Sequence, residues 1–399
     1  MMEMRKSGTK VWFVALLACL TLALSAAFMA ATVSEAQAVT GTFDLSKNLR
    51  MAEGTPAPNV TFTFDFARRS FNGSTEAAQL ARIPEISPRT VTPTTAGAAA
   101  GGVVTLSGST NALAGITFTE AGIYSWTVTE RVTATGVGPN SAVTFSQAVY
   151  ELRVYVVNAP AGGLAIELVA VHRHVNTVGG TTCLDTGQPL PRKVDTMIFV
   201  NEYRRNHPVD ATNGAFAVSK QVTGLFADLT QTFTFDVVMT ASALCPANTT
   251  FVARRVNAAG TQVGANITFT SGVSQAVVLG HNERLIFDGP IAVGSTFDVT
   301  ERAADAHIAS VEVIANGVTT NLANTAVNQP RPTGTHIVGP ERNAANFTNA
   351  HQAPVATGLV ITSAPLYALI FGTGLALSAF VAQRTRKRIE ELPFGGAGF

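Results

Sequence analysis

Two lysines, two glutamates and two asparagines stand where an extended chain would point them into apolar surroundings. In a β-strand, residues two apart share one face. The rows that contain these polar residues are Phe43, Leu45, Lys47 and Leu49; Trp126, Val128, Glu130 and Val132; Phe199, Asn201 and Tyr203; Phe216, Val218, Lys220 and Val222; Phe297, Val299 and Glu301; and Phe347 and Asn349. A lone charge that faces a core is very costly, so these groups are expected to interact with one another.

This combination of groups can form an amide bond. A lysine ε-amine can attack an asparagine carboxamide, release ammonia and leave an amide cross-link. The amine must be neutral to attack, and burial lowers the pKa of lysine. Burial raises the pKa of a glutamate, which can then donate and accept protons, and aromatic neighbours hold the groups in contact. The alternative is that these residues lie at strand edges with solvated heads and snorkelling lysines.

These residues belong to an internal repeat. The segment Thr61–Phe66 recurs with one change as Thr232–Val237, and Val-Thr-Glu-Arg at 128–131 recurs at 299–302. The lysine-to-glutamate separation is 83 residues in the first unit (130 − 47) and 81 in the second (301 − 220). We therefore predict two homologous domains, residues 39–206 and 212–351, joined by a short linker at 207–211.

The composition and the periodicity of these units are typical of strands. Hydrophobic residues make up 46% of the chain and charged residues 13%, and short alternating runs are separated by glycine and proline turns. No segment between the two ends shows a convincing helical period. We expect an all-β fold of two tandem immunoglobulin-like β-sandwiches, with the strand order left open.

Both ends of the chain read as targeting segments. A basic start, an apolar run and Ala36-Gln37-Ala38 predict a signal peptide over residues 1–38. A retained anchor helix and lipidation at Cys19 are the alternatives. Residues 359–382 carry no charge and are long enough to span a bilayer as a transmembrane helix. The basic tail at 383–399 then favours the cytoplasmic side, which leaves the preceding domains outside the cell; the alternative is a buried helix.

The residues before this apolar segment resemble the sortase sorting signal of Gram-positive surface proteins, Leu-Pro-x-Thr-Gly. The sequence over 352–358 includes Pro354, Val355, Ala356, Thr357 and Gly358, with proline where the family has leucine and valine where it has proline. The resemblance implies that sortase cleaves between threonine and glycine. It would then pass the threonine to a cell-wall peptidoglycan amine or to a lysine of another pilin subunit.

The two units also resemble known domains of Gram-positive pilins and adhesins. The first is similar to the streptococcal-type pilin isopeptide-linkage domain, with its Gly-aromatic-Val-Thr-Glu strand and closing Phe-x-Asn-x-Tyr. The second is similar to a collagen-adhesin B-type domain, with Val-Ser-Lys-Gln-Val-Thr-Gly at 218–224 and Phe-Thr-Asn at 347–349. The resemblance implies that Lys47 bonds to Asn201 with Glu130 assisting, and that Lys220 bonds to Asn349 with Glu301 assisting.

Other classes of site find little support. The net charge of +1 gives no basic face for nucleic acid. His172 and His174 share a strand face, but no third ligand is evident, so we expect no metal and no cofactor. Cys183 and Cys245 lie in different predicted domains, and a disulfide between them, a reactive thiol and a thioester all stay open. No motif of a turnover enzyme is present.

The sequence therefore predicts a secreted structural protein of the cell wall or cell surface, a pilin-like subunit or wall-anchored stalk. Its precursor would be a single-pass membrane protein with the C-terminus inside the cell. The alternative is an adhesin that presents the same domains to host matrix or glycan. An extracellular enzyme would need a further catalytic domain, for which the length leaves little room.

Overall fold

The computed structural model describes residues 39–175, 191–210, 212–352, 373 and 375–386, and these are mostly strand. This confirms the expected predominance of β-structure. The predicted signal peptide, the sorting-like motif and most of the predicted span at 359–382 lie outside the described residues. Within the described part of the chain, no helix has the length and apolar character that crossing a membrane requires.

Residues 44–205 form two sheets that face each other. One has the strand order β4-β5-β1-β11-β7 and the other β10-β9-β8-β6-β2-β3. The strands are β1 (Asp44–Ala52), β2 (Thr61–Phe71), β3 (Arg89–Val91), β4 (Thr95–Ala96), β5 (Val103–Asn111), β6 (Gly122–Thr135), β7 (Ser141–Thr144), β8 (Val149–Asn158), β9 (Leu164–Val175), β10 (Arg192–Val194) and β11 (Met197–Arg205), with one short helix, α2 (Ala77–Leu80). We call this pair of sheets the first domain.

Residues 216–351 form a second pair of sheets, with strand orders β15-β14-β17-β12-β23-β19-β20 and β16-β13-β18-β21; β22 also pairs with β18. The strands are β12 (Phe216–Thr223), β13 (Thr232–Thr240), β14 (Thr250–Val256), β15 (Ile267–Thr270), β16 (Ser274–Gly280), β17 (Arg284–Phe287), β18 (Thr296–Glu301), β19 (His307–Ala315), β20 (Val318–Leu322), β21 (Arg331–Pro332), β22 (His336–Ile337) and β23 (Ala344–His351). We call this pair the second domain.

The repeated segments occupy equivalent places in the two domains. In β2 the alternate residues Phe62 and Phe64 are fully buried, and Phe233 and Phe235 are buried in β13. The aspartate that follows each second phenylalanine points outward, where Asp65 pairs with Arg131 and Asp236 with Arg302. The two-residue alternation therefore assigns the same residues to core and surface in both domains.

Each domain places its first and last strands side by side and parallel. β1 pairs with β11, and β12 pairs with β23. Parallel neighbours need a long return connection, and here the whole of each domain supplies it. A bond between such strands would tie the entry point of each domain directly to its exit point.

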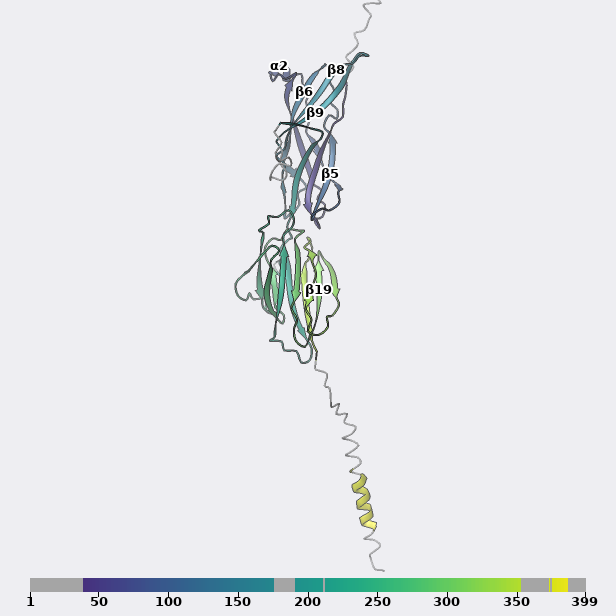
Figure 1. Ribbon diagram of the computed structural model, residues 1–399, viewed down its shortest axis with the longest axis vertical. Coiled ribbons are helices and arrows are strands. Elements are labelled where there is room, and N and C mark those ends of the chain that lie inside the picture. Colours follow the sequence, from purple (N-terminus) through teal and green to yellow (C-terminus); the bar gives the residue numbers. More distant parts are fainter. Residues whose placement is uncertain (1–38, 176–190, 211, 353–372, 374, 387–399) are drawn as a thin grey trace, which may run out of the picture.

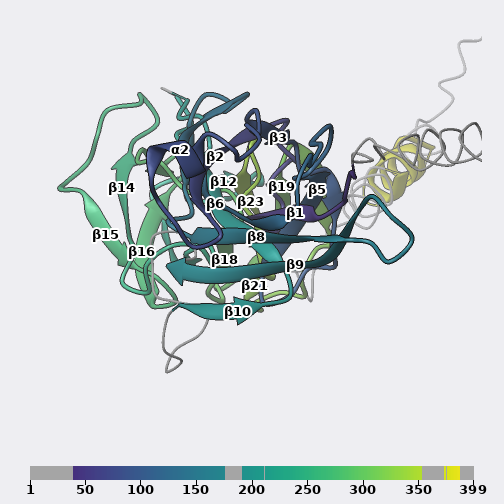
Figure 2. The ribbon, with the colours of Figure 1, turned by 90° about the horizontal axis from the view of Figure 1, so that it is seen from above.

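The two domains are stacked end to end along the long axis (Figure 1). Figure 2 shows the same stack from one end. Backbone hydrogen bonds cross the junction from His207 to Ile291 and from Val293 to Arg205, each 2.8 Å. Gly294 has a φ of +88°, and an added Cβ would lie 2.5 Å from that of Ala52 in the first domain, so the junction requires glycine there.

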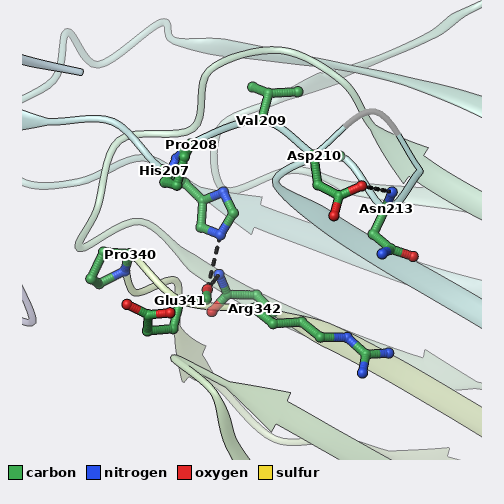
Figure 3. Close-up of a pocket in the computed structure, with 10 residues that line it drawn as sticks. His207, Pro208, Val209, Asp210, Asn213, Pro340, Glu341 and Arg342 are labelled. Carbon is green, nitrogen blue, oxygen red and sulfur yellow. Dashed lines mark hydrogen bonds between the residues drawn. The ribbon is translucent and has the colours of Figure 1, made fainter. Parts of the chain in front are cut away.

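The predicted linker is partly built into this junction. The imidazole Nε2 of His207 lies 2.9 Å from the backbone oxygen of Glu341 (Figure 3), and the histidine is only 6% exposed. The segment between the domains is therefore held against the second domain rather than acting as a free spacer.

Candidate cross-linking sites

Lys47, Glu130 and Asn201 meet in the core of the first domain. Lys47 lies on β1 and Asn201 on the neighbouring β11, while Glu130 reaches across from β6 in the facing sheet. The Lys47 amine donates to Glu130 Oε2 at 2.9 Å, and the Asn201 amide nitrogen donates to Glu130 Oε1 at 2.6 Å. The two groups that could condense are therefore bound to the two oxygens of one carboxyl group.

The strand register explains why these side chains meet. Lys47 is paired with Phe199, and Asn201 with Leu49, so the lysine and asparagine are offset by two residues and point to the same side of the sheet. In the facing sheet, Glu130 pairs with Phe64. A slip of one residue in either sheet would turn the side chain away from the site.

Aromatic rings close the first site to solvent. The Lys47 Nζ lies 4.5 Å from the centroid of the Phe62 ring, and Phe199 packs against Phe64 and Tyr150 at centroid distances of 4.9 and 5.0 Å. The lysine and asparagine are both 0% exposed. The alternative of solvated heads at strand edges is therefore wrong, because no part of either side chain reaches water.

Burial changes the protonation of this pair. It lowers the pKa of Lys47 to about 8, against the opposing effect of Glu130, and it raises the pKa of Glu130, against the opposing effects of Lys47 and Asn201. Both shifts favour the neutral amine beside the neutral acid, because an apolar site solvates charge poorly. A neutral amine is the form that can act as a nucleophile.

A backbone group that the sequence did not reveal also contacts the first site. The N–H of Ser146, just after β7, donates to Asn201 Oδ1 at 2.7 Å. This bond fixes the orientation of the carboxamide and places a donor where negative charge would develop on its oxygen. No residue type marks such a donor, since every residue except proline carries one.

The second domain repeats the arrangement. Lys220 on β12 and Asn349 on β23 each donate to Glu301 Oε1 at 2.6 Å, and Glu301 comes from β18 in the facing sheet. Lys220 pairs with Phe347, and Asn349 with Val222, which is the same two-residue offset.

The electrostatics of the second site match those of the first. Burial lowers the pKa of Lys220 to about 8 and raises that of Glu301. The Lys220 Nζ lies 4.0 Å from the centroid of the Phe233 ring, and the lysine, glutamate and asparagine are 0–1% exposed. The alternative of solvated strand-edge heads is wrong here too.

The two sites differ in how completely their polar atoms are satisfied. Among the described residues, neither Asn349 Oδ1 nor Glu301 Oε2 has a hydrogen-bond partner, although both atoms are buried. The carbonyl of Asn201, by contrast, accepts a backbone N–H. The first site is therefore better organised to stabilise charge on the amide oxygen.

The remaining predicted sites stay apart from these two. His174 Nε2 lies 3.0 Å from the Glu151 carboxylate, and the described residues contain no group of three or more metal-ligating side chains. Cys245 is half-buried, and Cys183 lies outside the described residues. The sorting-like residues Pro354, Val355, Ala356, Thr357 and Gly358 also lie outside them.

Comparison with known proteins gives low-identity matches. Residues 214–350 match a family described as a domain of unknown function (DUF7601). Among solved structures, the chain is similar to a major pilin of Streptococcus pyogenes (19% identity, 79% of this chain, 100% of the pilin, TM-score 0.33), to a second major pilin of that species (15%, 78%, 98%, 0.30) and to the pilus-presented adhesin Cpa (12%, 78%, 100%, 0.26). No curated protein matches the sequence. The likeness to these structures is one of fold alone.

Proposed function

We propose that this chain is a cell-surface structural protein, a pilin-like subunit or wall-anchored stalk, whose two immunoglobulin-like domains each form an internal Lys–Asn amide bond. One observation carries the proposal. In both domains, a buried lysine amine and a buried asparagine amide are bound to the same buried carboxyl group. Such proximity in a dry site removes most of the entropic barrier to condensation.

The reaction follows from the groups in place. In the first domain, Lys47 passes a proton to Glu130, and its neutral nitrogen attacks the side-chain carbonyl carbon of Asn201. The Ser146 N–H stabilises the oxygen as negative charge develops on it. Glu130 then protonates the departing nitrogen, the C–N bond to that nitrogen breaks, and ammonia leaves. The amine gives up two hydrogens in all, and the new amide carries the remaining one.

The position of the bonds suits resistance to pulling. Tension applied to the chain ends enters the first domain at β1 and leaves at β11, which are adjacent and parallel. A bond from Lys47 to Asn201 would transmit that tension directly and leave the intervening chain without load. The same holds for Lys220 and Asn349 in the second domain.

The sequences at the two ends of the chain support the proposed location at the cell surface. A signal peptide over 1–38, a sorting-like motif at 352–358 and an apolar segment followed by basic residues together support export and sortase attachment. Cleavage after Thr357 would leave both domains on the cell surface, joined to peptidoglycan or to another subunit.

Intact-mass spectrometry tests the proposal. Folded ectodomain, residues 39–352, should weigh about 34 Da less than its sequence mass, because each condensation releases one ammonia. Glu130→Gln and Glu301→Gln should each restore about 17 Da, and the two variants serve as controls for each other. A folded wild-type ectodomain at its full sequence mass would refute the cross-links.

A further inference from the structure

Lysine is scarce in this protein. The sequence contains six, of which Lys6 and Lys10 precede residue 38 and Lys387 follows the apolar segment. The part that would remain outside the cell therefore keeps only three lysines, at 47, 193 and 220. All other basic side chains there belong to arginine or histidine, which do not accept acyl groups as a lysine amine does.

Two of the three lysines are committed to the buried sites. Lys47 and Lys220 are 0% and 1% exposed, and each is bound to a glutamate inside its domain. No external enzyme can reach either amine in the folded protein. Lys193 is thus the one lysine left for chemistry at the surface.

Lys193 lies on an accessible edge of the first domain. It is the middle residue of β10, the edge strand of the six-stranded sheet, and it pairs with His172 on β9. Its side chain is exposed, and no residue in the described part of the chain forms an ion pair with it. An edge strand also offers unpaired backbone groups along which an extended peptide can dock.

We infer that Lys193 is the amine that accepts the Thr357 acyl group of a second copy of this chain, an inference that rests on the proposed sortase attachment. The cysteine thiolate of the transpeptidase breaks the Thr357–Gly358 bond, forms a thioester with Thr357 and releases the Gly358 amine. The neutral Lys193 nitrogen then attacks the thioester, the carbon–sulfur bond breaks, an amide forms, and the cysteine returns to its thiolate. The Gly358 nitrogen takes up one proton as it leaves and the Lys193 nitrogen gives up one as the amide forms, so the protons balance.

The geometry makes the acceptor a different molecule. β23 starts beside the junction, since Glu341 and Asn343 contact His207 and Ala215. Its eight residues carry the chain about 26 Å away from the first domain, toward the far end of the stack (Figure 1). Six further residues reach Thr357 and span at most about 22 Å, which is less than the length of β23. Thr357 therefore cannot return to Lys193 of its own copy, and each transfer joins the end of one copy to the first domain of another.

The test uses the full-length protein in the cell that makes it. Wild type should give a ladder of covalent species on a denaturing gel of wall extracts, and Lys193→Arg should collapse the ladder to one species. Arg192→Ala, in the same short strand, is the matched control and should keep the ladder. Tandem mass spectrometry of the wild-type ladder should find the Thr357 carbonyl joined to the Lys193 nitrogen.

The outcomes separate this inference from the proposed cross-links. A ladder that persists in Lys193→Arg, or a Thr357 carbonyl found only on another amine, would overturn the assignment of Lys193. The absence of a ladder in wild type would also overturn it. In each case, the ammonia loss of the Lys193→Arg ectodomain shows independently whether the internal bonds have formed.

Discussion

Replacing Asn201 by alanine should remove one cross-link and destabilise the first domain alone. The proposed bond from Lys47 to Asn201 closes a loop of about 150 residues. In the chain-entropy treatment of cross-links, a loop of that length contributes about 5 kcal/mol to the free energy of unfolding, by restricting the unfolded chain. For a domain of this size, that loss lowers the unfolding temperature by about 10–20 °C.

The alanine also removes the acceptor for the Ser146 N–H, which costs about 1–3 kcal/mol by itself. Glu130→Gln separates the two effects, because it blocks the reaction while leaving the Asn201 carbonyl bound to that N–H. Both variants should therefore lose the cross-link contribution, and only Asn201→Ala should lose the additional hydrogen bond.

The assay is calorimetry or guanidinium unfolding of the ectodomain, with the mass of each sample checked first. Asn201→Ala should shift the transition of the first domain and leave that of the second unchanged. Asn349→Ala is the matched control and should do the reverse. The reasoning fails if a sample shown by mass to lack the first bond unfolds at the wild-type temperature.

Three further predictions concern the reacting groups. Ser146→Pro removes the backbone N–H that donates to the Asn201 carbonyl, and it should slow ammonia loss in the first domain about 10²–10³-fold. Ser146→Ala keeps this N–H and should react at the wild-type rate. Time-resolved intact-mass measurements distinguish the two variants, and equal rates would exclude a role for this donor. Burial lowers the pKa of the free Lys47 amine in the folded chain from 10.5 to about 8. Asn201→Ala keeps this amine free and buried, so its unfolded state should bind more protons between those values, and the free energy of unfolding should rise with pH there, by at most about 1.4 kcal/mol per pH unit. Denaturant titrations at pH 7–10.5 measure this, and a flat or falling profile would contradict it. An amine-acylating reagent applied to the native wild-type ectodomain should modify Lys193 and the N-terminal amine but not Lys47 or Lys220, because the last two are buried and, by the proposal, already bound as amides. The native double variant Asn201→Ala/Asn349→Ala, in which both amines stay free, should show the same protection, and acylated Lys47 in its peptide map would disprove the burial of this amine.

Which side chains of each domain face the core could largely be predicted from the local sequence pattern. Alternation placed Lys47 in one apolar row, with Leu45 and Leu49, and Glu130 in another, with Trp126 and Val128, and these residues are buried. The repeat then required the second domain to follow the first. These conclusions depend on side chains two residues apart pointing the same way, which is a property of the extended backbone itself.

Whether Lys47, Glu130 and Asn201 come together depends on the pairing of strands that are far apart in the sequence. Lys47 and Asn201 are separated by most of a domain, and only the parallel β1–β11 register brings them together. A shift of one residue would have kept every local pattern and lost the site. The family resemblance supplied these partners, whereas spacing along the chain could not.

The sequence by itself determined the residue types, their repetition and which side of each strand they occupy. The tertiary structure decided which lysine meets which asparagine, that a backbone N–H contacts one carboxamide, and that Lys193 lies on the strand at the edge of its sheet, as far as the described residues extend. The physical reason is that alternation is fixed within a few residues, whereas register, facing sheets and edges are fixed by the packing of segments far apart in the chain.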